Sequence, residues 1–178
     1  MFASHYASLI FLRNYKDAQS KQRQIMCDMR KNTKDVNAME KEINAYKRAK
    51  TNEIKLGYQK GKAIYSQSLF AEGKALAGYT DANGSPDLEK MRADNMMQVY
   101  SQELAQFHQK MAEQQQAELA LLELEIEAMQ ERELEPLKQL AEDLEIDKAN
   151  ADQEVEITKS AYEASKKMAQ ENTKNMWA

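Results

Sequence analysis

The apolar residues of this chain recur every three or four positions over most of its length, with polar residues between them. This spacing places apolar side chains on one face of an α-helix, whereas a half-buried strand needs strict alternation. Two such runs, residues 16–77 and 87–178, flank a stretch at 78–86 where Gly, Asn, Asp, Ser and Pro gather. The pattern predicts an all-α fold: a single domain, residues 1–178, built as one long, coiled-coil-like antiparallel helical hairpin.

The first run contains a predicted seam whose residues step by three, four and seven positions, close to the heptad spacing of a coiled coil. The seam residues are Ile25, Met29, Val36, Met39 and Ile43. Asn32 takes one inward position as a polar exception. Cys27 lies between Met26 and Met29 in this apolar neighbourhood, which favours a seam residue over a reactive thiol.

The second run holds eight of the fifteen leucines of the chain between residues 119 and 144, so we place the core there. Its predicted seam residues are Leu122, Ile126, Met129, Leu137 and Leu140. Pro136 lies inside this run. Because proline lacks an amide hydrogen and its ring clashes with the preceding turn, we expect a kink or break near residues 132–136. That break would divide the hairpin into three or four helices.

The turn is assigned to Asn83, Gly84, Ser85 and Pro86. An Asn-Gly pair favours a β-hairpin only between strand-like runs, and none flank it. We therefore predict that Ser85 caps the second arm and that Pro86 takes its first helical position, where the missing amide hydrogen costs nothing. A fold-back at about residue 82 would place Ile43 level with Leu121.

The segment 1–15 is predicted to form a separate amphipathic helix. Three roles stay open for it: packing on the end of the bundle, contact between subunits, or contact with a membrane surface. The last is weakened because residues 1–12 contain no Lys or Arg. The candidate subunit contacts are Phe2, Tyr6, Leu9, Ile10 and, near the other end, Trp177. No apolar run reaches the roughly 18–20 residues that span a bilayer, and no cleavable signal peptide is expected.

The two arms carry opposite charge. Residues 1–77 contain 15 Lys and Arg against 7 Asp and Glu, a net charge of +8. Residues 118–156 contain 3 Lys and Arg against 14 Asp and Glu, a net charge of −11. Opposite signs favour the pairing of unlike arms, within one hairpin or between neighbouring subunits. Because two helices bury only one stripe each, we also expect the chain to bind copies of itself.

The sequence offers no catalytic or metal-binding pattern. Its two histidines, His5 and His108, do not stand in the Glu-x-x-His arrangement of di-iron bundles, and Cys27 is the only cysteine. The acidic residues repeat along helix faces, and the Lys and Arg of the first arm alternate with Asp and Glu. We therefore expect no enzyme activity, no cofactor and no nucleic-acid partner.

The paired arms, the apolar start from Phe2 to Leu12, the Gly/Asn/Asp tip and the apolar end Met176-Trp177 resemble flagellin-like and type III secretion filament subunits. This resemblance implies polymerisation through the terminal helices and a surface appendage that is exported without a cleavable signal peptide. The tip is too short for the variable outer domain of flagellins. The expected function is a structural, self-assembling subunit of a filament, tube or ring. The alternative is a coiled-coil adaptor or scaffold, intracellular or in a virus particle.

Overall fold

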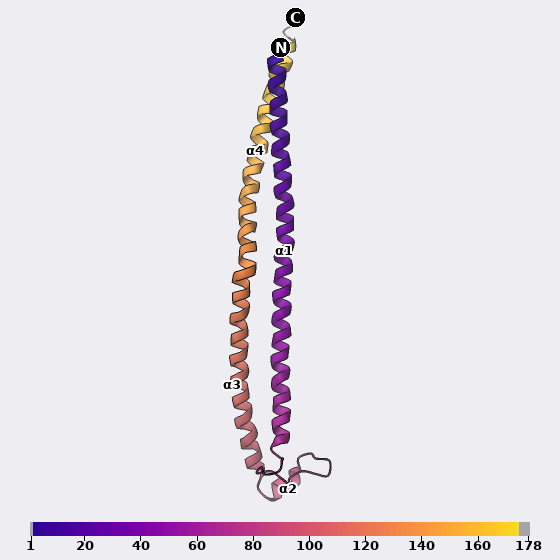
Figure 1. Cartoon of the computed structure of the whole chain (residues 1–178), viewed down its shortest axis with the longest axis vertical. Helices are drawn as coiled ribbons and strands as arrows, with labels where there is room; N and C mark the ends of the chain where they lie inside the picture. Colours follow the sequence, from indigo (N-terminus) through magenta and orange to yellow (C-terminus); the bar gives the residue numbers. More distant parts are fainter. Residues whose placement is uncertain (1, 175–178) are drawn as a thin grey trace. The chain divides into compact units, whose positions relative to one another are not determined.

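The computed structural model describes residues 2–174, with side chains from residue 5 onward. Its helices are α1 (Phe2–Ser68), α2 (Leu88–Ala93), α3 (Met97–Met129), the π-helix η1 (Gln130–Leu134) and α4 (Glu135–Lys174) (Figure 1). An isolated antiparallel bridge between Thr80 and Pro86 is the only strand-like pairing among the described residues. The fold is an all-α helical hairpin, as the periodicity predicts.

Helix α1 is uninterrupted from Phe2 to Ser68, since it contains no proline and only two glycines. The predicted boundary after residue 15 is absent within this helix, so the N-terminal segment is not a separate element. The predicted first arm also extends too far, because α1 ends at Ser68 and residues 69–77 are turns.

The contacts divide the chain into two compact units. Unit 1 comprises residues 1–41 and 130–178, and unit 2 comprises residues 42–129. In unit 1, α1 pairs with α4: Lys21 Nζ lies 2.9 Å from Glu154 Oε2, and Asn32 Nδ2 lies 2.9 Å from the carbonyl oxygen of Leu137. The partner's number falls as the number in α1 rises, so the two segments are antiparallel.

Unit 1 has a regular seam. Its buried and half-buried positions alternate steps of three and four residues in both helices, which is the heptad pattern of a coiled coil. In α1 they include Tyr15, Ala18, Gln22, Ile25, Met29, Asn32, Val36 and Met39. In α4 they include Leu137, Ala141, Leu144, Lys148, Ala151, Val155, Thr158, Tyr162, Ser165 and Ala169. The α4 side is mostly small or polar, so leucine packing is confined to the part nearest η1.

The π-helix η1 corrects two predictions. Of the kink or break expected near residues 132–136, the break is absent, because α3, η1 and α4 follow one another without a gap. The wider π turn lies where the proline ring would otherwise meet the carbonyl of Arg132. It also adds a residue to the seam, which passes from Met129 to Leu134, 5% exposed. Leu140 is therefore turned off the seam and is 46% exposed.

In unit 2, the second part of α1 runs antiparallel to α3. The hydroxyl of Tyr46 donates to Glu125 Oε1 at 2.8 Å, and that of Tyr65 donates to Glu103 Oε2 at 3.0 Å. The rings of Tyr65 and Phe107 stack with centroids 3.7 Å apart. Four seam side chains of this unit are buried, namely Ile43, Tyr58, Leu122 and Ile126.

The observed register differs from the expected one. Tyr46 bonds to Glu125 across the two antiparallel helices. Ile43 precedes Tyr46, so it lies opposite residues that follow Glu125 and not opposite Leu121. The first turns of α3 contact α1 through Glu103, and they also contact the apolar cluster at the tip of the hairpin through Tyr100 and Leu104.

The tip, residues 69–96, has an apolar core of its own. Leu76 and Met91 are 1% and 0% exposed, the most completely buried large side chains among the described residues. The residues packed around them are Tyr65, Leu69, Phe70, Tyr79, Met96, Met97, Tyr100 and Leu104. The leucine-rich segment 119–144, where the sequence analysis placed the core, is therefore not the best-packed part of the described residues. A compact cluster buries side chains on all sides, whereas a seam between two helices leaves them partly exposed.

The loop of the tip corrects the capping prediction. Helix α2 begins at Leu88, and its N-cap is Asp87, whose carboxylate accepts a hydrogen bond from the Lys90 amide at 3.0 Å. Ser85 and Pro86 precede the cap, with Pro86 in the bridge to Thr80. The tight turn between Thr80 and Pro86 needs a glycine at position 84, since Gly84 has a φ of +79°.

Asp81 organises the other predicted turn residues. Its Oδ1 accepts hydrogen bonds from the backbone amides of Asn83 and Ser85, both at 2.8 Å. Two backbone hydrogen bonds of 2.8 Å, from Asp81 to Ser85 and from Asp87 to Tyr79, close the loop. An Asx turn thus replaces the simple helix-to-helix connection that the sequence suggested.

Candidate functional site

The described residues contain no cluster of three or more His, Cys, Asp or Glu side chains that could hold a metal ion. None of the helices in this part of the chain has an apolar stretch long enough to cross a membrane. The single cysteine, Cys27, is exposed on α1, so its predicted place in the seam is wrong.

Three of the five predicted subunit-contact residues are exposed near the start of α1. Tyr6 is 68%, Leu9 63% and Ile10 44% exposed. The side chain of Phe2 and all of Trp177 lie outside the residues that the structure describes. Ala7, Ser8 and Leu12 occupy the half-buried positions here, so Tyr6, Leu9 and Ile10 lie off the seam.

Helix α4 carries exposed apolar residues of its own, which sequence reasoning missed. A shallow hollow lined by His5 and Ser8 of α1 and by Ala169 and Thr173 of α4 places the start of α1 beside the end of α4. Ile157 and Met168 of α4 are 69% and 62% exposed. Their spacing of eleven residues, three helical turns, puts them on one line off the seam. We call Tyr6, Leu9, Ile10, Ile157 and Met168 the terminal apolar residues.

Two rows of opposite charge run along the outer sides of unit 1. The basic row consists of Lys16, Arg23 and Arg30, each seven residues from the next. The acidic row consists of Glu135, Glu142, Glu156 and Glu163, with Ala149 in the one intervening position. Each of these residues directly follows a seam residue, so each side chain is turned about 100° from the seam. All are exposed, and none forms an ion pair with any described residue.

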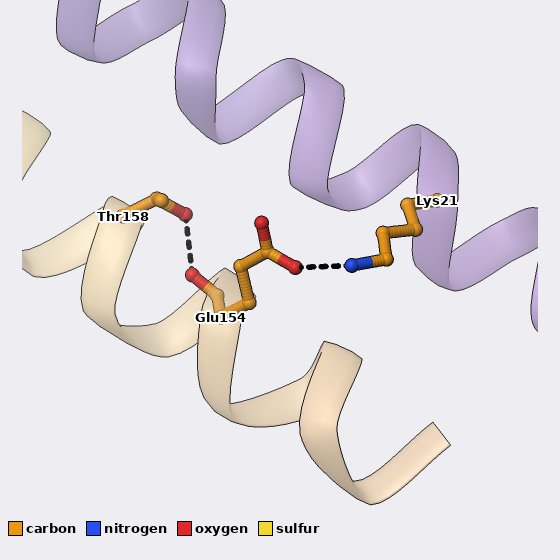
Figure 2. Close-up of polar contacts among 3 residues, drawn as sticks. All are labelled: Lys21, Glu154 and Thr158. Atoms are coloured by element: carbon orange, nitrogen blue, oxygen red, sulfur yellow. Dashed lines mark hydrogen bonds and ion pairs between the residues drawn. The ribbon is translucent and has the colours of Figure 1, made fainter. Parts of the chain in front are cut away.

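The flank of the seam is closed by polar contacts within the chain. Figure 2 shows Lys21 reaching from α1 to Glu154, while the hydroxyl of Thr158 donates to the Glu154 carbonyl at 2.7 Å. The hydrogen bond to Glu154, followed by its charge, raises the pKa of Lys21 above its ordinary value. Because both side chains are largely exposed, this pair selects the register more than it stabilises the fold.

Unit 2 has an open groove of about 830 Å³ between α1 and α3. Its lining includes Tyr46, Tyr58, Met111, Glu118 and Glu125. The hydrogen bond to Glu125, then desolvation, raises the pKa of Tyr46; for Tyr58, burial comes first and the hydrogen bond to Glu118 second. A raised pKa keeps these phenols protonated, so they act as hydrogen-bond donors across the helices and are poor candidates for a general base.

No protein-family model, no curated protein and no solved structure matches this chain.

Proposed function

We propose that this protein is a structural subunit that assembles with copies of itself, side by side, into a filament, tube or ring. The observation that carries the proposal is the set of terminal apolar residues, which are exposed on both helices of unit 1. Large apolar side chains that stay exposed on a pair of helices are candidates for contact with another protein.

The energetics of unit 1 support self-association. Much of the α4 seam is small or polar, as with Ala151, Thr158 and Ser165, so burial along the seam is modest. Burying apolar surface contributes about 25 cal/mol per Å². Further burial of Leu9, Ile157 and Met168 against another copy would add to a core that one hairpin leaves incomplete.

The alternative is a coiled-coil adaptor that binds other proteins. The groove of unit 2 favours it, because Tyr46, Tyr58 and Met111 offer the aromatic and flexible side chains common in protein-binding surfaces. The two functions predict different behaviour of the purified chain: an assembly grows with its own concentration, whereas an adaptor needs a partner.

The test compares three purified chains by light scattering and negative-stain microscopy over a hundredfold range of concentration. One is native, one carries Leu9→Ser, Ile10→Ser and Met168→Ser, and the control carries Leu56→Ser and Ile64→Ser. Leu56 and Ile64 are 54% and 66% exposed, but they lie in unit 2. We expect the native and control chains to form large assemblies and the terminal variant to stay small. A native chain that keeps one small size at every concentration refutes the proposal.

A further inference from the structure

The basic and acidic rows of unit 1 point to a specific packing of neighbouring copies, and this inference rests on the proposed self-assembly. We infer that the basic row on α1 of one copy docks against the acidic row on α4 of the next, with both copies pointing in the same direction. Rows of opposite charge thus meet between chains, as helices of opposite charge already do within one chain.

The two rows match in period. Both repeat every seven residues, a rise of about 10.5 Å along a helix, so a single displacement can bring successive Lys or Arg side chains beside successive Glu side chains. A contact that repeats along a row gains from several weak pairs at once, whereas an isolated exposed pair contributes little.

The rows also match in level. Gln22 donates to Asp152 at 2.6 Å and Lys21 pairs with Glu154, so Arg23 lies at the height of residues near Asp152. Glu156 is then about one helical turn away, within reach of an arginine side chain. Two copies that lie side by side, at equal height and in the same direction, therefore bring the basic row of one beside the acidic row of the other with no shift along the helix axis.

Other pairings of the same surfaces are disfavoured. Contact between two α1 helices would place Arg23 and Arg30 of one copy against the same cations of the other, and contact between two α4 helices would oppose their Glu side chains. Like charges brought together across an interface act against the wrong arrangement. The charges thus select the partner helix, and the terminal apolar residues supply the burial.

A second copy fits these rows better than a nucleic acid. A polyanion would meet the three cations of the basic row but would be repelled by the acidic row on the same unit and by a net charge of −4. A second copy satisfies both rows.

Two outer-face positions allow a direct test. Cys27 lies four residues after Arg23 and three before Arg30, so it shares their face. Ala149 fills the gap in the acidic row and is exposed. Mild oxidation joins two thiols only when their Cα atoms are within roughly 7 Å, which makes a disulfide a strict reporter of contact.

Three chains are oxidised at assembling concentration and resolved by size on a denaturing, non-reducing gel. The native chain reports contact between two α1 faces, Cys27→Ser with Ala149→Cys reports contact between two α4 faces, and Ala149→Cys alone reports α1 against α4. We expect covalent products larger than one chain only from the last. Intermolecular products from either single-thiol chain, or from none of the three while assemblies are present, overturn the inference.

Charge reversal gives an independent test. One chain carries Lys16→Glu, Arg23→Glu and Arg30→Glu, a second carries Glu142→Lys, Glu156→Lys and Glu163→Lys, and a third carries all six changes. The matched control reverses three exposed cations of unit 2, Lys47, Lys55 and Lys60. Helix content by circular dichroism verifies folding in each.

We expect each triple variant to raise the concentration needed for assembly at least tenfold, and the sixfold variant and the control to assemble nearly as the native chain does. Assembly that is indifferent to both triple variants overturns the inference but leaves the proposed function standing. A native chain that never assembles overturns the proposed function itself. If the basic-row variant instead loses binding to double-stranded DNA while its assembly is unchanged, the row serves a nucleic acid and the inference is wrong.

Discussion

The side-chain nitrogen of Asn32 donates a hydrogen bond of 2.9 Å to the backbone carbonyl of Leu137, three residues beyond η1. Asn32 is 4% exposed, and its Oδ1 has no hydrogen-bond partner among the described residues. A buried amide that is half satisfied costs stability, but it accepts only one alignment of the two helices. We therefore expect Asn32 to help set the register of unit 1, near the place where η1 changes the phase of the seam.

Replacement of Asn32 by leucine should therefore stabilise the protein and loosen its register. We expect Asn32→Leu to raise the free energy of unfolding in urea by about 1 kcal/mol, because an unsatisfied polar atom is removed. Thr33→Leu, at the exposed neighbouring position, is the matched control and should change little. Below the concentration at which the chain assembles, a spin-label distance between Cys27 and a thiol introduced by Ala149→Cys should be single-valued in the native background and broader with Asn32→Leu. Lower stability of Asn32→Leu would contradict this role.

Two features can account for η1: the proline at position 136 and the extra residue that the seam needs between Met129 and Leu134. Mutation can distinguish them. Pro136→Ala restores an amide donor but leaves the extra residue that carries the seam from Met129 to Leu134. We expect Pro136→Ala to keep the π-helix and to gain less than the roughly 3 kcal/mol that a proline costs inside an unbroken α-helix. Deletion of Glu133 in the Pro136→Ala background should convert η1 to regular α-helix while Leu134 stays buried. Amide hydrogen exchange and a structure of each variant decide the matter, and an α-helical η1 in Pro136→Ala alone would refute the argument from phase.

The limits of sequence reasoning are visible in particular residues. Periodicity was sufficient for the helices and for Ile43, Leu122 and Ile126 as inward positions, because three- and four-residue steps report a helix face directly. It failed at Leu140, since a π turn moves the phase by one residue and leaves no compositional sign except a nearby proline. It also treated the tip as a polar turn, although Leu76 and Met91 are its buried centre.

The cross-helix hydrogen bonds of the candidate surfaces could not be predicted either. Tyr46 and Tyr65 bond to Glu125 and Glu103, and these partners follow from the register of the two helices, which the sequence analysis placed differently. The charge rows are different, since a seven-residue repeat of Lys and Arg or of Glu is present in the sequence itself. It becomes interpretable once the seam is known and the rows are seen to lie beside it.

Gly57 and Gly61 form a matched pair for testing how closely α3 approaches α1. A Cβ at Gly57 would meet no described atom within 4 Å, whereas a Cβ at Gly61 would lie 3.1 Å from the terminal methyl carbon of Met111. We expect Gly57→Ala to stabilise the helix by about 1 kcal/mol, the usual difference between these residues. Gly61→Ala should gain less, because Met111 must move, although its flexible side chain can do so. Urea unfolding of the two variants measures the difference, and an equal gain at both sites would show that the approach of Met111 has no cost.

The tyrosines of unit 2 make stability depend on alkaline pH. In the folded protein the pKa values of Tyr46 and Tyr79 are raised above the ordinary 10.0 chiefly by hydrogen bonds to Glu125 and Asp94. The pKa of Tyr65 is raised first by burial and then by its hydrogen bond to Glu103. A raised folded-state pKa means that the folded state holds the proton more tightly than the unfolded state does.

The stability that these protonated tyrosines contribute is therefore complete below the ordinary tyrosine pKa of about 10. It is lost as the pH rises through the raised pKa values of the folded protein. We expect the urea midpoint to show no tyrosine-dependent change between pH 7 and 9 and to fall above pH 10. Lys21 and Lys50, whose pKa values are also raised by partner glutamates, contribute in the same direction, so the comparison must be made between variants. Tyr46→Phe removes the hydroxyl but keeps the ring, and it should flatten the alkaline fall relative to the native chain. A native fall that Tyr46→Phe leaves unchanged would mean that this hydrogen bond does not hold the two helices of unit 2 together.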